Sequence, residues 1–418
     1  MTRRLVAIAL LVFGCAVRDS GRVRVEMWAL GREGEVLSDL VRDFERENPG
    51  IDVDVQQMPW TAAHEKLLTA IVGESTPDVG HIGNSWIPEF EAIGAVEDLT
   101  PYAARSADVL QADYFPGIWA TNVVDQKLYG IPWYVDTRVM FYRKDILAAA
   151  GFPNPPRSWS EWVRAAAAVR KSGHRYAILL PTNEWPTPVA LGQQSGSSLL
   201  RDGGRYGDFS APPFRRGFEF YLDFFRRGDA PVVSATQVAN VFQQFAEGDF
   251  AMYITGPWQI GEFRRRLPPS MEGKWTTAPL PAPDGTPYPG TSLAGGGSLV
   301  IFERSQQKEA SWKLIEFLSR AEQQVRFFEL TGNLPSRRPA WNAPAVAGDQ
   351  ELKAFRAQLE NVTPMPAVPQ WEQIATTVFD HSEIAIRGQL TPERALAALD
   401  QKTDAILEKR RWMLENRK

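Results

Sequence analysis

Residues 129–145 bring together the side-chain types that hold a polyhydroxylated ring. Trp133 and Tyr134 precede the carboxylate of Asp136, and Arg138 follows two positions later. The apolar C–H face of a sugar packs on an aromatic ring, and its hydroxyls form charge-assisted hydrogen bonds with carboxylates and arginine. Since neighbouring strand residues point to opposite faces, Tyr134 and Asp136 share one face and Trp133 points the other way. The segment predicts a sugar contact by Tyr134 and Asp136, with Arg138 either joining it or pairing only with Asp136.

The length and composition of the chain narrow the class of protein. Its 418 residues can form two domains or one large two-lobed unit. The hydrophobic share of 44% and the charged share of 23% are typical of a soluble globular protein. The net charge is −4, and no basic cluster alternates with aromatic residues. Nucleic-acid binding is therefore not expected.

The few cysteine and histidine residues argue against disulfides and metal sites. Cys15 is the single cysteine, so no internal disulfide can form. None of the four histidines forms a pair with zinc-ligand spacing. We expect neither a metal nor a cofactor.

Residues 1–20 have the architecture of a secretory signal. A short basic stretch ends at Arg4, and an apolar run from Leu5 to Gly14 follows, too short to span a bilayer. Cys15 comes directly after Gly14, as in a bacterial lipobox, where the cysteine is lipidated. Phe13 is bulkier than the residue usual there, so a plain signal peptide is the alternative. The prediction is a periplasmic or extracytoplasmic protein, lipid-anchored through Cys15.

The first hundred residues after this signal alternate strand and helix patterns. Strands are predicted at 23–27, 51–55 and 77–82, and helices at 36–47, 62–72 and 86–93, which indicates a mostly parallel sheet with helices on both faces. Ligands bind at the carboxyl ends of such strands. The loops expected to form a site are therefore 28–35, 57–61, 83–86 and 133–138.

The rest of the chain is richer in helices and is divided by two proline- and glycine-rich segments. These segments, 279–297 and 335–344, are predicted to be crossovers. Strands are expected at 176–180, 250–254 and 298–302. Helices are expected at 145–175, 214–227, 238–247, 306–331, 349–360, 371–388 and 392–415.

Six segments in order resemble bacterial ABC-transporter extracellular solute-binding proteins of family 1, the maltose/oligosaccharide-binding type. The resemblance runs over about residues 22–412, and the trehalose/maltose-binding proteins are the closest pattern. The segments are Phe44–Ile51, Pro77–Trp86, Gly130–Arg138 with Phe141–Asp145, Phe245–Trp258, Gly295–Ile301 and Thr331–Arg337.

This resemblance implies a two-lobed α/β periplasmic-binding-protein fold of type II, each lobe a mostly parallel sheet flanked by helices, with the ligand in the cleft. The lobes are expected at 21–132 plus 289–335 and at 133–288 plus 336–418. The partners it implies are a sugar and an inner-membrane permease with its ATPase. The protein itself is expected to be monomeric and to have no enzymatic activity.

The resemblance also suggests which side chains line the cleft. Tyr134 and Asp136 match lining positions, Trp258 a stacking ring, and Arg337 a cleft arginine, with Arg338 next to it. Trp371 is equally consistent with closing over the sugar and with packing inside the protein. The further candidates are Glu33, Glu35, Gln57, Asn84, Arg138, Gly296 and Gly297.

Three functions remain open at this stage. The first is capture of a neutral α-glucoside, with maltose and trehalose as the leading candidates. The second is capture of an anionic solute, such as a uronide or a glycerol phosphodiester, because Arg138 and Arg337 would suit an anion. The third is a tethered glycosidase-like enzyme, because two cleft carboxylates such as Glu33 and Asp136 are also what glycoside hydrolysis uses.

Overall fold

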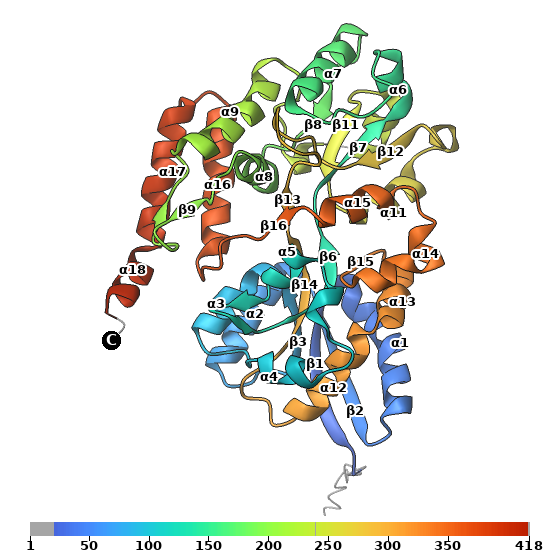
Figure 1. The fold of residues 1–418 in the computed structure, drawn as a ribbon, viewed down its shortest axis with the longest axis vertical. Helices are drawn as coiled ribbons and strands as arrows, with labels where there is room; N and C mark the ends of the chain where they lie inside the picture. Colours follow the sequence, from blue (N-terminus) through green and yellow to red (C-terminus); the bar gives the residue numbers. More distant parts are fainter. Residues whose placement is uncertain (1–20, 239, 417–418) are drawn as a thin grey trace, which may run out of the picture.

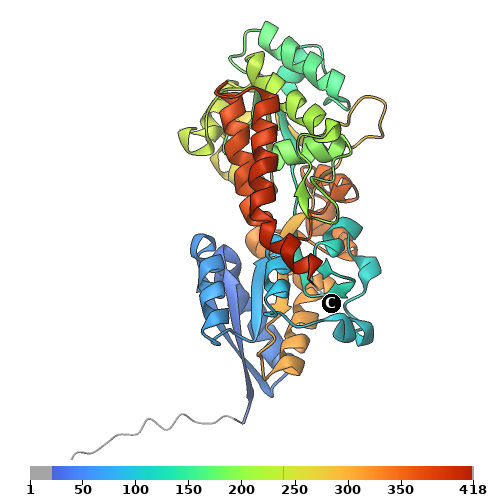
Figure 2. The same ribbon diagram turned by 90° about the vertical axis from the view of Figure 1, so that its left-hand side faces the viewer.

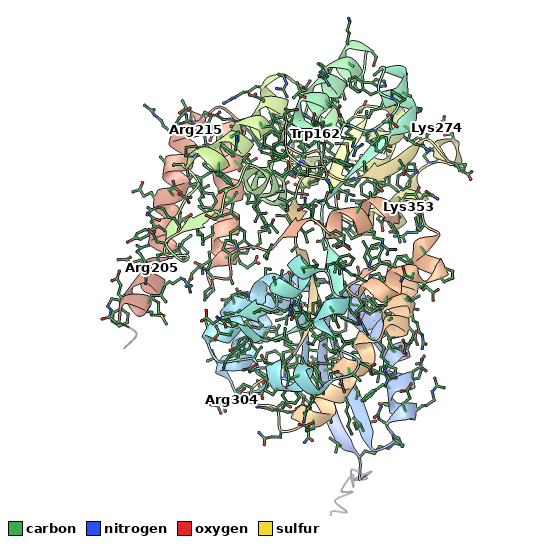
Figure 3. All side chains as sticks on the ribbon, in the orientation of Figure 1. Trp162, Arg205, Arg215, Lys274, Arg304 and Lys353 are labelled. Atoms are coloured by element: carbon green, nitrogen blue, oxygen red, sulfur yellow. The ribbon has the colours of Figure 1, made fainter. Side chains whose placement is uncertain are left out.

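The computed structural model describes residues 21–238 and 240–416, and these form two bodies stacked along the long axis of the molecule (Figure 1). Cys15 and the rest of the signal segment lie outside the described residues. Each body has one main sheet with helices around it. Figure 3 shows Trp162 inside the upper body, and Lys274 and Arg304 on the outside of the molecule.

The sheet of the lower body has six strands in the order β15-β6-β14-β3-β1-β2. Alternate residues of β1 are buried, among them Val25, Met27 and Ala29, as the alternating pattern predicts. Its bounds are β1 Val23–Leu30, β2 Ile51–Met58, β3 Val79–Gly83, β6 Ile131–Asp136, β14 Gly295–Ile301 and β15 Leu334–Pro335.

The sheet is mixed, which corrects the expectation of mostly parallel strands. β1 pairs in parallel with β2 and β3, whereas β14 is antiparallel to both β3 and β6, and β15 is antiparallel to β6. The reversed strands come from the part of the chain after residue 290, which returns from the upper body.

The upper body has a four-stranded sheet in the order β12-β7-β11-β8, also mixed. Its helices α7 and α9 pack Trp162, Phe224 and other rings over this sheet. The bounds are β7 Val139–Arg143, β8 Ile178–Leu179, β11 Met252–Thr255, β12 Trp275–Ala278, α6 Lys144–Ala149, α7 Trp159–Lys171, α8 Pro186–Gln194, α9 Pro212–Arg226, α10 Val241–Glu247 and α11 Trp258–Arg266.

The helices of the lower body bury one apolar stripe each. In α1 this stripe is Leu37, Leu40, Val41 and Phe44, at helical spacing. Figure 2 shows the long C-terminal helices α16 and α17 side by side in the upper body. The bounds in the lower body are α1 Gly31–Glu47, α2 Trp60–Val72, η1 Asn84–Trp86, α3 Ile87–Ala92, α12 Lys308–Ser319 and α13 Ala321–Thr331. The C-terminal helices are α15 Leu352–Leu359, α16 Trp371–Ile386, α17 Pro392–Ile406 and α18 Glu408–Glu415.

Several predicted element boundaries were wrong. Helix α1 begins at Gly31 rather than at 36, so Glu33 and Glu35 are helical rather than in a loop. The stretches 306–331 and 392–415 each form two helices, which divide at Arg320 and Leu407. The predicted crossover 279–297 is shorter, because β14 already begins at Gly295. The lobe boundaries proposed from the sequence stay a prediction.

Candidate functional site

A cavity of about 630 Å³ lies between the two bodies, and several elements begin or end at it. The lower body contributes the start of α1, η1 and the ends of β3 and β6. The upper body contributes the first residues of α8, α11 and α16. Helix N-termini present unpaired N–H groups and partial positive charge. These helix starts therefore place partial positive charge near the cavity.

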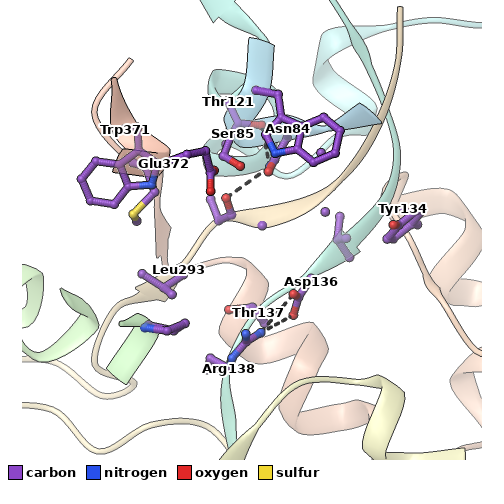
Figure 4. A pocket seen from close by; sticks show the side chains of 18 of the residues that line it. Asn84, Ser85, Thr121, Tyr134, Asp136, Thr137, Arg138, Leu293, Trp371 and Glu372 are labelled. Carbon is purple, nitrogen blue, oxygen red and sulfur yellow. Dashed lines mark hydrogen bonds and ion pairs between the residues drawn. The ribbon is translucent and has the colours of Figure 1, made fainter. Parts of the chain in front are cut away.

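Asp136 and Arg138 form an ion pair at the point where the chain passes from β6 to β7. The Arg138 Nη1 donates to both carboxylate oxygens of Asp136, at 2.8 and 3.0 Å (Figure 4). Burial raises the pKa of Asp136, and the Arg138 guanidinium opposes that rise. Both side chains line the cavity, so the pairing that the sequence left as an alternative is present in addition to the cleft position.

Tyr134 lies two residues before Asp136 on the same face of β6 and also lines the cavity. Its ring packs edge-on against His81, with a centroid distance of 5.5 Å. Burial raises the pKa of Tyr134 well above its usual value, and the nearby carboxylates of Glu33 and Asp136 add to the rise. The hydroxyl therefore stays protonated and remains a hydrogen-bond donor. The expectation that Trp133 points the other way is wrong, because the pairing of β6 with β14 shifts register at this residue. Its ring stacks on Phe327 at 4.1 Å and packs against His81 at 5.1 Å, and Tyr134 contacts the same two rings. Trp133 does not line the cavity.

Glu33 lies in the first turn of α1 and is only 8% exposed. The Asn333 Nδ2 donates to its Oε1 at 2.8 Å, and both residues line the cavity. A carboxylate at this end of a helix is stabilised by the helix dipole. Glu33 is thus a fixed acceptor that faces the space where a solute would lie.

Asn84 stands at the end of β3, where the sheet rule places ligand contacts. Its Nδ2 donates to the Thr121 Oγ1 at 3.0 Å and to the Ala294 carbonyl at 3.2 Å. Its side-chain carbonyl remains as an acceptor toward the cavity.

Trp258 is the first residue of α11 and is 46% exposed. The Arg138 guanidinium carbon lies 4.6 Å from the centroid of its ring. The ring folds back over Gly256, where a Cβ added to the glycine would come within 2.0 Å of the Trp258 Cζ3. Only glycine at position 256 permits this presentation of the ring.

Trp371 begins α16 and packs edge-on against Trp185, at 5.6 Å between ring centroids. The residue is 1% exposed, and its Nε1 has no hydrogen-bond partner among the described residues. The ring packs in the upper core and also lines the cavity, so its packing role is confirmed and its contact with the sugar stays a prediction. Figure 4 shows it beside Glu372, opposite Asp136 and Arg138.

Gly296 and Gly297 allow β14 to cross close to β6. Gly296 lines the cavity and has a φ of +143°, a conformation that favours glycine. A Cβ on Gly297 would come within 2.4 Å of both His81 and Tyr134. Gly297 does not line the cavity, and its effect on the site is through the position of Tyr134.

Besides Gly297, four candidates are not brought to this cavity. Gln57 and Glu35 contact each other at 3.4 Å on the exposed side of α1. Arg337 is buried, where it pairs with Asp113 and donates to the Ser319 carbonyl at 3.2 Å. Arg338 pairs with Glu360 instead. The structure therefore places neither arginine in the cavity wall.

The cavity also has walls that the sequence patterns did not identify. Trp60 and Trp86 are not among the candidate side chains, yet both line the cavity. Both rings lie in the loops 57–61 and 83–86, which the rule on strand ends selected without singling out these side chains. Trp185 and Met365 come from irregular segments without a periodic pattern. The other missed lining residues include Ser85, Thr121, Thr137, Pro186, Asn333 and Glu372.

Within residues 21–238 and 240–416 no cluster of His, Cys, Asp and Glu is arranged to hold a metal ion. Over the same ranges no helix combines the length and apolarity that a membrane span requires.

Comparisons with known proteins agree with this architecture. Residues 28–325 match the family model for bacterial extracellular solute-binding proteins. The sugar-binding protein MalE from Xanthomonas citri is 49% identical, with a TM-score of 0.92, over 95% of this chain and 100% of that one. An ABC-transporter solute-binding protein from Thermotoga lettingae with bound α-D-tagatose is 26% identical, with a TM-score of 0.74, over 92% of this chain and 100% of that one. A Brucella abortus (strain 2308) protein named only as a binding protein is 28% identical over 402 residues, 94% of each chain.

Two α/β bodies with a walled cavity between them define a solute-binding protein of the periplasmic-binding-protein fold. The family match covers well over half of the chain, and the chain belongs to the bacterial extracellular solute-binding proteins. Members of this family bind solutes without converting them, so the glycosidase-like alternative is set aside.

Proposed function

We propose that this protein is the sugar-binding component of an ABC importer, and that it captures a neutral α-glucoside, maltose or trehalose, in the cavity between its two bodies. The observation that supports this most directly is the pairing of aromatic rings with fixed polar groups around one space. The rings are Trp60, Trp86, Tyr134, Trp185, Trp258 and Trp371, and the polar groups include Glu33, Asn84 and Asp136.

Each part of this wall has a counterpart in a sugar. Aromatic faces and edges contact its C–H surfaces. Carboxylate and amide oxygens accept hydrogen bonds from hydroxyl groups, and tyrosine, tryptophan and backbone N–H groups donate to them. The cavity volume of about 630 Å³ is within the range, roughly 300–1,000 Å³, of small-molecule sites.

The charges in the cavity favour a neutral ligand over an anionic one. Three carboxylates line it, those of Glu33, Asp136 and Glu372, against one guanidinium, that of Arg138. Arg138 already pairs with Asp136, and Arg337 is directed elsewhere. An anion would meet uncompensated negative charge, which costs free energy in a partly buried site.

The similar proteins support the same class of ligand. The protein 49% identical to this chain is a sugar-binding protein, and the one 26% identical was crystallised with a sugar. The resemblance of the sequence to trehalose/maltose-binding proteins narrows the proposal to α-glucosides. We also propose that Cys15 anchors the protein to the membrane, next to the permease that receives the sugar.

Calorimetric titration of the purified protein tests the proposal. Maltose and trehalose are compared with a uronide disaccharide and a glycerol phosphodiester under identical conditions. We expect saturable heat with one or both neutral disaccharides and none with the anions. Binding of an anion with no binding of a neutral sugar would contradict the proposal. Mass spectrometry of the mature N-terminus, with Cys15→Ser as control, tests the anchor.

A further inference from the structure

The space between the two bodies does not end at Trp258. A second cavity of about 610 Å³ lies beyond it, between the start of α11 and the end of α13. The two cavities share wall residues, which form the partition between them. These are Glu33, Trp60, Pro257, Trp258 and Asn333. The cavities are therefore adjacent compartments of one cleft.

The two faces of Trp258 differ in what covers them. Arg138 lies over the ring at 4.6 Å, and Arg138 lines the first cavity but not the second. The guanidinium thus occupies the ring face on the side of the first cavity. Since Trp258 is 46% exposed and also lines the second cavity, its open surface is available to a ligand there.

The charged side chains of the second cavity largely neutralise one another. The Arg264 Nη2 donates to the Asp349 Oδ1 at 2.7 Å, and Arg265 pairs with Glu262. The Arg32 Nη2 donates to the Leu330 carbonyl at 3.2 Å. These paired groups can still form hydrogen bonds at the edge of the second cavity, but their charges give little net electrostatic potential there. Such a surface suits a hydroxylated, uncharged ligand.

The partition between the two cavities contains both hydrogen-bonding groups and an aromatic ring, which are the contacts that a sugar needs. The Glu33 carboxylate and the Asn333 amide are held together at 2.8 Å on one side, and the Trp258 ring stands in the same partition. A chain of sugar rings that passes here meets hydrogen-bonding groups and an aromatic surface, the same combination as in the first cavity.

We propose that the second cavity is an additional sugar subsite, occupied by the third and later rings of a linear oligosaccharide whose first two rings fill the first cavity. The inference rests on the proposed sugar-binding function and extends it from disaccharides to longer chains. It assigns the open face of Trp258 to the outer rings and leaves Arg138 in place over the other face.

Gly261 offers a way to close the second cavity alone. It lines that cavity and not the first, and a Cβ there meets only the Arg265 guanidinium, at an ordinary 3.4 Å. Gly261→Leu fills the cavity without adding a ring that could stack. Gly261→Ala is the matched control, since both changes replace a glycine inside helix α11 and both favour the helix.

The experiment titrates the wild-type protein and both variants with malto- and cello-oligosaccharides of two, three and four rings. We expect the wild type to bind a tetrasaccharide about tenfold tighter than the disaccharide of the same series, a difference of about 1.4 kcal/mol. Gly261→Leu should abolish this gain and leave the disaccharide affinity unchanged, whereas Gly261→Ala should keep both.

Two results would overturn the inference while the sugar-binding function stands. One is a wild type that binds disaccharides and gains nothing with chain length. The other is a gain that survives in Gly261→Leu. If no member of either series binds, the inference fails, and the proposed function fails with it only if trehalose does not bind either.

Discussion

We expect this protein to lose stability in mild acid, because His81 is buried in its neutral form. The residue lies on β3 behind the cavity wall and has no exposed surface. The rings of Trp60, Trp133 and Tyr134 surround it at 5.1 to 5.5 Å. Its Nδ1 accepts from the Leu30 N–H at 3.3 Å, so the ring is neutral in the folded protein.

Burial lowers the pKa of His81 from 6.5 to about 3. Below pH 6.5 the unfolded chain binds a proton that the folded protein does not, so folding is opposed increasingly as the pH falls. Each pH unit in this window costs about 1.4 kcal/mol, which gives about 2 kcal/mol between pH 6.5 and pH 5. This contribution is fully present above pH 6.5 and is lost as the pH falls toward 3.

Urea unfolding at pH 7.5, 6 and 5, followed by tryptophan fluorescence and circular dichroism, measures the effect. The variant His81→Asn keeps an acceptor for the Leu30 N–H and does not titrate, so its stability should fall less with pH. In contrast, the Glu89 hydrogen bond raises the pKa of His64 despite partial burial. The variant His64→Asn should therefore steepen the acid loss. If His81→Asn loses as much stability between pH 7.5 and 5 as the wild type, the reasoning is wrong.

Three further changes test the wall of the cavity. Gly297→Ala should lower the free energy of unfolding by about 1–3 kcal/mol, because the new Cβ overlaps Tyr134; an unchanged urea midpoint would contradict this. Asp136→Asn should cost about 2–3 kcal/mol of stability, because Arg138 stays mostly buried without its counter-charge, and should also weaken sugar binding in calorimetry. Trp371→Phe removes the unpaired Nε1 and part of a buried ring, and should weaken sugar binding by about 1 kcal/mol in calorimetry and also lower the midpoint of thermal unfolding.

Local patterns were enough to predict the first half of the lower sheet. The alternation in Val23–Leu30 and the helical stripe of α1 depend only on neighbours in sequence, and the structure confirms both elements. A strand was predicted at 298–302, where β14 lies, but its antiparallel pairing with β3 could not be predicted in this way, because the two strands lie more than two hundred residues apart. The start of α1 was placed too late because Gly31 and Gly34 weaken the helical pattern there.

The binding site also contains residues that local patterns identify and residues whose position depends on distant parts of the chain. Asp136 was found from the local pattern of aromatic rings and a carboxylate, and Asn84 from the resemblance; both stand at strand ends, where a general rule places ligand contacts. Arg337 was placed in the cleft from resemblance alone. Its burial beside Asp113 depends on a residue more than two hundred positions earlier, which no local pattern reveals.

The position of residues 134–138 links the binding site to the connection between the two bodies. Asp136 ends β6 in the lower sheet, and Val139 begins β7 in the upper sheet. The neighbouring crossing runs from β13, Ser292–Leu293, to β14, and the Ser292 hydroxyl donates to the Arg138 carbonyl at 2.9 Å. Any rotation of one body relative to the other must change backbone angles in these two short crossings. A solute that bonds to Asp136 and Arg138 therefore contacts the segment that such a rotation moves, so its binding energy can favour one relative orientation of the bodies over another.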